Sequence, residues 1–178
     1  TIVESVDKIR DTARSHNRLF FVEVMGRDNG NLALYSAIAS GACFVIIPEK
    51  EFEVNNLAER LKTGKSLSKS SSVVIVAEGN NYGPSYKIAE DLKQVFDEYE
   101  SKVTILGHLQ RGGSPVVMDR LIASRLGLSA VQALMSENYG NMVGIIKNET
   151  VLIPMQDVVD KQKKINEDLY KLNKIISR

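Results

Sequence analysis

The chain has 178 residues, of which 43% are hydrophobic and 25% are charged, a composition typical of a globular protein. Its formal net charge of +1 gives no reason to expect a nucleic-acid or membrane partner, so an anion site would need local clustering of basic residues. A single cysteine, Cys43, excludes a disulfide framework within the chain and fits a reducing compartment such as the cytoplasm.

Helical and strand-like segments alternate along the sequence. Apolar residues at helical spacing predict helices, β-branched apolar runs predict strands, and the last two strand-like runs predict a hairpin or strand pair. The strands are apolar throughout, which is typical of a parallel sheet covered on both faces, so we expect an α/β fold with helices on both sides. The predicted elements are helix 2–14, strand 18–24, helix 31–40 ended by Gly41, strand 43–48, helix 53–64, strand 72–79, helix 86–99, strand 102–110, helix 118–136 interrupted at Gly127, strands 141–148 and 150–154, and helix 160–176.

Polar and charged side chains follow four of the predicted strands. In open α/β sheets, ligands bind beyond the carboxyl ends of the strands, so these residues are expected at one edge. Arginine suits phosphate oxygens, and a carboxylate suits the hydroxyl groups of a sugar, so the set favours a small phosphorylated polyol. The residues are Met25, Gly26 and Arg27 after "LFFVEV", Glu49 and Lys50 after "CFVIIP", Glu78 and Gly79 after "VVIVA", and His108, Gln110 and Arg111 after "VTIL".

Taken singly, each of these residues has a simpler structural explanation. An arginine after a strand usually solvates a loop, a lone histidine is usually structural, and the glycines of "QRGG" at 110–113 suit a turn. Only their coincidence at one edge indicates a site. "GNNYG" at 79–83 fits neither the dinucleotide fingerprint nor the P-loop and is interpreted as a turn, and two histidines and one cysteine without ligand spacing predict no metal site.

Several motifs together resemble one family. "SHNR" at 15–18, "EVMGR" at 23–27, "IPE" at 47–49 and "LGHLQRGGSP" at 106–115, followed by "DRLIASRLG" at 119–127, resemble bacterial-type 6-phosphofructokinase over nearly the whole chain. The resemblance implies a three-layer α/β/α fold, phosphorylation of fructose 6-phosphate in glycolysis, ATP and Mg²⁺ as donor and cofactor of the full enzyme, and a cytoplasmic homotetramer.

The resemblance also implies roles for individual residues. Met25, Gly26 and Arg27 match the loop that contacts the sugar, and Arg27 would stabilise the transferring phosphoryl group as a catalytic residue. Glu78 would bind sugar hydroxyls. The sugar and its 6-phosphate would be held by His108 and Arg111, and by Arg18 and Lys102 from a neighbouring subunit. Lys102 stands where the family has arginine, so it keeps the charge but loses the planar fork.

The family's effector site is expected to be weakened in this chain. The matching positions are Arg10, Gly41, Cys43, Lys69 and Ser71. Cys43 replaces a glutamate that helps to hold the effector's magnesium, and the basic run before the third strand retains only Lys69. We therefore expect the usual effector response to be lost, and strong activation of the complete enzyme by ADP would refute this hypothesis.

The family's ATP-binding loops and catalytic aspartate are not found, and in the family they precede the segment that matches Thr1. We therefore expect a carboxyl-terminal part that binds no ATP or Mg²⁺ and is inactive alone. Residues 1–106 with 157–178 would form the sugar-phosphate domain, and 107–156 would belong to the missing nucleotide domain. The latter would expose Leu121, Ile122, Val131 and Leu134, to be covered by another copy or a rearranged contact. The alternatives are a pyrophosphate-dependent phosphofructokinase, a non-catalytic sugar-phosphate module and an unrelated flavodoxin-like domain.

Overall fold

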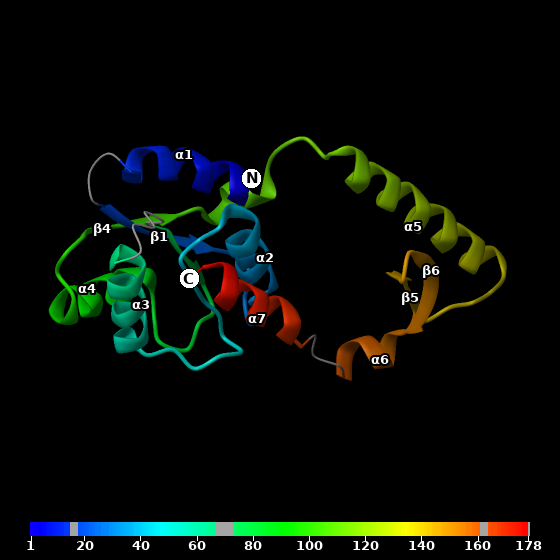
Figure 1. Cartoon of the computed structure of the whole chain (residues 1–178). Helices are drawn as coiled ribbons and strands as arrows, with labels where there is room; N and C mark the ends of the chain where they lie inside the picture. Colours follow the sequence, from blue (N-terminus) through cyan, green and yellow to red (C-terminus); the bar gives the residue numbers. More distant parts are fainter. Residues whose placement is uncertain (15–17, 67–72, 161–163, 178) are drawn as a thin grey trace. The chain divides into compact units, whose positions relative to one another are not determined.

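The computed structural model describes residues 1–14, 18–66, 73–160 and 164–177 (Figure 1). The chain divides into two compact units, Thr1–Gly112 with Lys164–Arg178, and Gly113–Lys163. The sequence placed the corresponding boundaries after Leu106 and before Asp157. The assignment of these segments to sugar-phosphate and nucleotide binding stays a prediction.

The first unit is built on a four-stranded sheet in which all neighbouring strands are parallel. The strand order is β2 (Phe44–Ile46), β3 (Val73–Ala77), β1 (Arg18–Val24) and β4 (Glu100–Ile105). The register places Val22 of β1 opposite Ile75 of β3 on one side and Thr104 of β4 on the other. The loop that follows β1 is therefore flanked by the segments that follow β3 and β4.

Helices cover both faces of this sheet, as the sequence predicted. One face packs on α1 (Ile2–Arg14), α2 (Asn31–Ser40) and the segment that leads into α7 (Glu167–Ile176). The other packs on α3 (Val54–Ser66) and α4 (Ser85–Val95), and Figure 1 shows α1 on the side of the strands opposite α3 and α4. Strand β3 is buried throughout, because its alternate side chains enter the two cores in turn.

The second unit contains α5 (Val117–Met135), the strands β5 (Asn141–Ile146) and β6 (Glu149–Pro154), and α6 (Met155–Asp160). The two strands pair antiparallel, which confirms the predicted hairpin. Its two-residue turn, Lys147 and Asn148, has positive φ at both positions, as a type I′ turn requires. The Arg125 side chain of α5 donates a hydrogen bond of 2.9 Å to Asn148 Oδ1 and so ties the helix to this turn.

The predicted interruption of the long helix at Gly127 is wrong. Helix α5 runs without a break from Val117 to Met135, because a glycine weakens a helix without ending it. The apolar residues expected to be exposed on this helix are exposed within the chain: Leu121 by 49%, Ile122 by 39%, Val131 by 55% and Leu134 by 61%. What covers them stays a prediction.

Other predicted element ends also need correction. The strand expected over 102–110 ends at Ile105, because Leu106 already has helical dihedrals (φ −74°, ψ −36°) and Gly107 has a φ of 47°. Residues 107–111 form the 3-10 helix η1 (Gly107–Arg111). The helix expected over 86–99 ends at Val95. In place of the helix expected over 160–176, α6 ends at Asp160, and α7 begins after Asn166, whose side chain accepts hydrogen bonds from two amides of its first turn.

Candidate functional site

The candidate site lies beyond the carboxyl end of β1, where Met25 to Gly30 form a loop before α2. The sheet ladder ends here, with Glu78 N donating to Val24 O and Leu106 N donating to Glu23 O. The next backbone amides of the loop have no strand partner, so side chains from the neighbouring strand ends must supply acceptors for them.

Glu78 supplies one of these acceptors. Its Oε1 accepts hydrogen bonds from the amides of Gly26, at 3.1 Å, and Arg27, at 2.9 Å. These bonds, that of Arg27 first, together with the positive charges of Arg111 and Arg27, hold the pKa of the Glu78 carboxyl below its usual value. The carboxylate is therefore charged at neutral pH, and its Oε2 makes no such bond to the loop and is left to accept hydrogen bonds from ligand hydroxyl groups.

The backbone of the loop is held in an unusual conformation at Arg27, which has a φ of 47°. This left-handed conformation costs a non-glycine residue about 1–2 kcal/mol. Gly79, directly after Glu78, allows it: a Cβ at Gly79 would lie 1.9 Å from the carbonyl oxygen of Arg27. The glycine at position 79 thus lets the β3 end and the loop come into backbone contact.

These elements enclose a pocket of about 660 Å³ in the first unit, within the range usual for sites that bind small molecules. Arg27, Arg111 and Glu78 are among the residues that line it, and Leu32 and Tyr35 of α2 add an apolar wall. Such a lining can bind an anion through the arginines and hydroxyl groups through Glu78. Five of the predicted sugar-site residues line it: Met25, Gly26, Arg27, Glu78 and Arg111.

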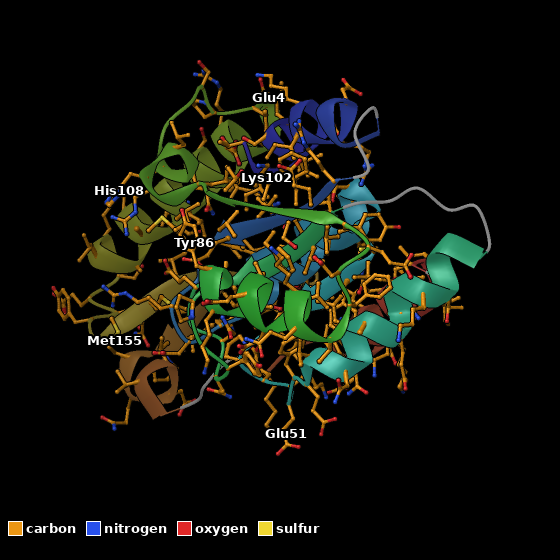
Figure 2. All side chains as sticks on the ribbon, turned by 90° about the vertical axis from the view of Figure 1, so that its left-hand side faces the viewer. Glu4, Glu51, Tyr86, Lys102, His108 and Met155 are labelled. Atoms are coloured by element: carbon orange, nitrogen blue, oxygen red, sulfur yellow. The ribbon has the colours of Figure 1, made fainter. Side chains whose placement is uncertain are left out.

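His108 is not among the residues that line this pocket. It lies exposed on η1, three residues before Arg111, and is labelled in Figure 2. Its predicted contact with the sugar stays a prediction.

Arg18 and Lys102 lie at the other edge of the sheet, near the starts of β1 and β4. The seven residues of β1 put Arg18 roughly 20 Å from the loop after Val24. Glu100 bridges the two cations, with Oε2 2.8 Å from Arg18 Nε and Oε1 2.6 Å from Lys102 Nζ. The hydrogen bonds from Lys102 and Arg18 lower the pKa of Glu100 to about 2. Within one chain, the structure therefore does not bring these two residues to the pocket.

The predicted effector positions lie elsewhere in the first unit. Arg10 is on α1, and its Nε and Nη2 are buried without a hydrogen-bond partner. Gly41 ends α2 in the left-handed conformation, as the sequence predicted for the residue that ends this helix. Cys43 is buried, its Sγ donates to Val73 O, and burial raises its pKa to about 12. Lys69 and Ser71 lie outside the described residues.

Two residues bind the loop although the sequence assigned them no role. Gln110 Oε1 accepts a hydrogen bond of 2.8 Å from Met25 N, and Glu49 Oε1 accepts one of 2.8 Å from Gly30 N. Both follow strands at the predicted edge, and that position was the only signal for them in the sequence.

No group of three or more metal-ligating His, Cys, Asp or Glu side chains is found among the described residues. The pocket holds one carboxylate, already bonded to the loop, so its donor set does not fit Mg²⁺. In the part of the chain that the structure describes, no helix is long and apolar enough to cross a bilayer.

Comparisons with known proteins agree with one another. The profile of the family described as phosphofructokinase matches residues 1–134. "ATP-dependent 6-phosphofructokinase 2" of Bacteroides thetaiotaomicron is 51% identical over 99% of this chain and 54% of its own length. "ATP-dependent 6-phosphofructokinase" of Cytophaga hutchinsonii is 48% identical over 97% of this chain and 52% of its own length. The solved phosphofructokinase of Saccharomyces cerevisiae is 32% identical with a TM-score of 0.82 over 89% of this chain and 22% of its own. The chain thus spans about half the length of the curated relatives it matches.

Proposed function

Because the chain belongs to the phosphofructokinase family, we propose that its pocket binds fructose 6-phosphate as part of an ATP-dependent 6-phosphofructokinase. The observation that carries this proposal is the joint lining of one pocket by Arg27, Arg111 and Glu78. Two arginines suit a phosphate and the phosphoryl group in transit, and a charged carboxylate suits the hydroxyl groups of the sugar.

Each residue then has a distinct task. Arg111, with His108 from the same 3-10 helix, holds the sugar and its 6-phosphate. Glu78 orients the sugar through Oε2, since Oε1 holds the loop. Arg27 lies on that loop, where its guanidinium would stabilise negative charge on the transferring phosphoryl group. The left-handed backbone conformation of Arg27 sets the direction in which its side chain leaves the loop.

Arg18 and Lys102 are proposed to act on the site of a neighbouring subunit in a homotetramer. They lie together around Glu100 at the edge of the sheet away from the pocket. A phosphate there would have to compete with the Glu100 carboxylate for both cations, which makes these two residues a weaker phosphate site than Arg111.

We place the phosphoryl donor, Mg²⁺–ATP, on parts of the longer family protein, because the pocket's donor set does not fit the metal. ATP supplies the phosphoryl group in that protein, and this chain supplies the binding and orientation of the acceptor sugar. The chain alone is therefore expected to bind the sugar phosphate without phosphorylating it.

Isothermal titration of the chain with fructose 6-phosphate tests the proposal, with Arg111→Ala as the deficient variant. A charge-assisted contact to phosphate contributes about 1.5–3 kcal/mol, so Kd should rise on the order of 10- to 100-fold. Lys93→Ala removes an exposed cation in the last turn of α4 and should leave Kd unchanged. Fructose without phosphate should bind the unaltered chain as weakly as the phosphate ester binds Arg111→Ala.

No binding of fructose 6-phosphate, or equal binding by Arg111→Ala, would overturn the proposal. Assays of the longer protein with ATP and with pyrophosphate then test the donor. Turnover with pyrophosphate alone would replace the ATP-dependent activity with the pyrophosphate-dependent one. Sugar-phosphate binding without turnover on either donor would leave a non-catalytic binding module.

A further inference from the structure

Gln110 joins two segments that both carry pocket residues. It lies on η1 between His108 and Arg111, and its Oε1 accepts a hydrogen bond of 2.8 Å from Met25 N, 85 residues earlier in the chain. Gln110 and Met25 are both part-buried. This bond is the direct side-chain link, among the described residues, between η1 and the loop that carries Arg27.

This bond gives the backbone amide of Met25 an acceptor that the β-sheet does not supply. Met25 N is the first amide beyond the ladder of β1, since the strand's last neighbours bond to Val24 O and Glu23 O. The amides of Gly26 and Arg27 are taken by Glu78 from the β3 side, and that of Gly30 by Glu49. Gln110 is the acceptor from the β4 side. Without it, Met25 N lacks a protein partner or the loop must move.

The backbone conformation of this loop needs to be stabilised by contacts from its neighbours. Arg27 keeps a left-handed backbone, which persists only where the surroundings determine it. Glu78 and Gly79 hold the Arg27 backbone from one side. Gln110 holds the residue at the start of the same loop from the other side, and the next residue of its own helix is Arg111.

We propose that Gln110 is a positioning residue for the sugar-phosphate pocket: its bond to Met25 N sets where Arg111 stands relative to Arg27. This proposal rests on the proposed function and adds a residue to its site. The guanidinium groups of Arg27 and Arg111 can bind one phosphorylated ligand together only if the distance between them fits that ligand. Loss of the bond from Met25 N to Gln110 therefore weakens binding by displacing Arg111, and not by removing a contact between Gln110 and the ligand.

A double-mutant cycle tests this. Gln110→Met keeps the length of the side chain and removes the acceptor, and we expect Kd for fructose 6-phosphate to rise about tenfold. In an Arg111→Ala background the same substitution should add less than about twofold, because the residue through which it acts is gone. Gln110→Glu retains the acceptor, so at high salt, where the added charge is screened, its Kd should lie closer than that of Gln110→Met to the Kd of the unaltered chain at the same salt concentration.

Three results would overturn the proposal: unchanged Kd in Gln110→Met, full additivity with Arg111→Ala, or no rescue by Gln110→Glu at high salt. Additivity would mean that Gln110 contacts the sugar independently. Hydrogen exchange of the Met25 to Arg27 amides supplies a readout without ligand: protection should fall in Gln110→Met and persist in Gln110→Glu. Should the unaltered chain fail to bind fructose 6-phosphate, the proposed function fails, and unchanged protection in Gln110→Met would separately refute the link between loop and η1.

Discussion

Glu78 Oε1 lies 2.9 Å from the backbone nitrogen of Arg27, so a carboxylate at the end of β3 holds the backbone of a residue that follows β1. The same oxygen accepts the amide of Gly26. A successive pair of amides pointing at one oxygen is an arrangement that favours anions. The loop is thus held by a charge as well as by a hydrogen bond, which has a measurable consequence.

Glu78 should make the stability of the chain depend on pH. Its pKa is lower in the folded chain than the usual 4.5, so its stabilising effect is complete above pH 4.5 and is lost as pH falls through the lowered pKa. Because Glu78 is exposed, the effect should be at most about 1 kcal/mol. Urea unfolding of the unaltered chain and Glu78→Gln should differ most above pH 4.5 and converge in acid. A constant difference across pH would contradict this.

Gly79→Ala should damage the loop. The added Cβ would lie 1.9 Å from the Arg27 carbonyl oxygen, so the loop must shift, at a cost of about 1–3 kcal/mol of unfolding free energy. Binding of fructose 6-phosphate should weaken with it. Gly127→Ala is the matched control: a Cβ there meets nothing within 4 Å, and in mid-helix it should stabilise α5 by about 0.5–1 kcal/mol. Equal effects of the two substitutions would refute the steric argument.

Glu100 should resist protonation until strong acid. Its pKa of about 2 results from the hydrogen bonds of Lys102 and Arg18. The stabilisation is present above pH 4.5 and is lost between pH 4.5 and about pH 2. Glu100→Gln should therefore unfold at a higher pH than the unaltered chain in an acid titration followed by circular dichroism. An unchanged acid midpoint would show that the two ion pairs contribute nothing to stability in solution.

Cys43 should be unreactive in the folded chain. With a pKa of about 12, only about 10⁻⁴ of the thiol is ionised at pH 8, against roughly a quarter for an exposed cysteine. Iodoacetamide should therefore label the native chain at least about a hundredfold more slowly than the urea-unfolded chain. Since Cys43 is the one cysteine of the sequence, the mass of the labelled protein reports this position alone. Comparable rates would mean that the thiol is accessible.

The exposed apolar side chains of α5 should promote association. Val131 and Leu134 are 55% and 61% exposed and lie at helical spacing on this helix. Sedimentation velocity should show a concentration-dependent increase in mass at micromolar levels. Replacing both residues by glutamine, which keeps helix propensity, should reduce it. A chain that stays monomeric at every concentration would contradict the prediction that another copy covers this helix.

Much of the fold could be predicted from the sequence because burial leaves a clear pattern. The fully apolar β3 indicated a sheet covered on both faces, and alternate residues of this strand do enter two cores. The strand-end rule predicted that Arg27, Glu78 and Arg111 would meet at one edge of the sheet, and all three line one pocket. Both the covered sheet and the shared strand ends follow from the topology of the fold, which can be predicted from the pattern of apolar and polar residues.

What the sequence could not show depends on backbone conformation and on distant contacts. The run from Lys102 to Ile105 contains no local signal for η1, which the chain enters through helical dihedrals at Leu106 and a positive φ at Gly107. The bond from Met25 N to Gln110 joins residues 85 positions apart. Nothing local in either segment indicates that Met25 and Gln110 are partners. The sequence therefore assigned no specific function to Gln110, although it lies between the candidate ligands His108 and Arg111.

The place of β1 between β3 and β4 has a further consequence for how this protein can vary. Glu78 and Gln110 reach the same loop from opposite flanks because the last residues of β3 and β4, Ala77 and Ile105, pair with the end of β1. A single-residue insertion or deletion in β3 would turn the side chain at position 78 to the opposite face of the sheet, and one between β4 and η1 would move Gln110 away from Met25 N. Strand length is therefore under as strict a constraint here as residue identity, and length differences among functional variants should be confined to the connections on the other edge of the sheet.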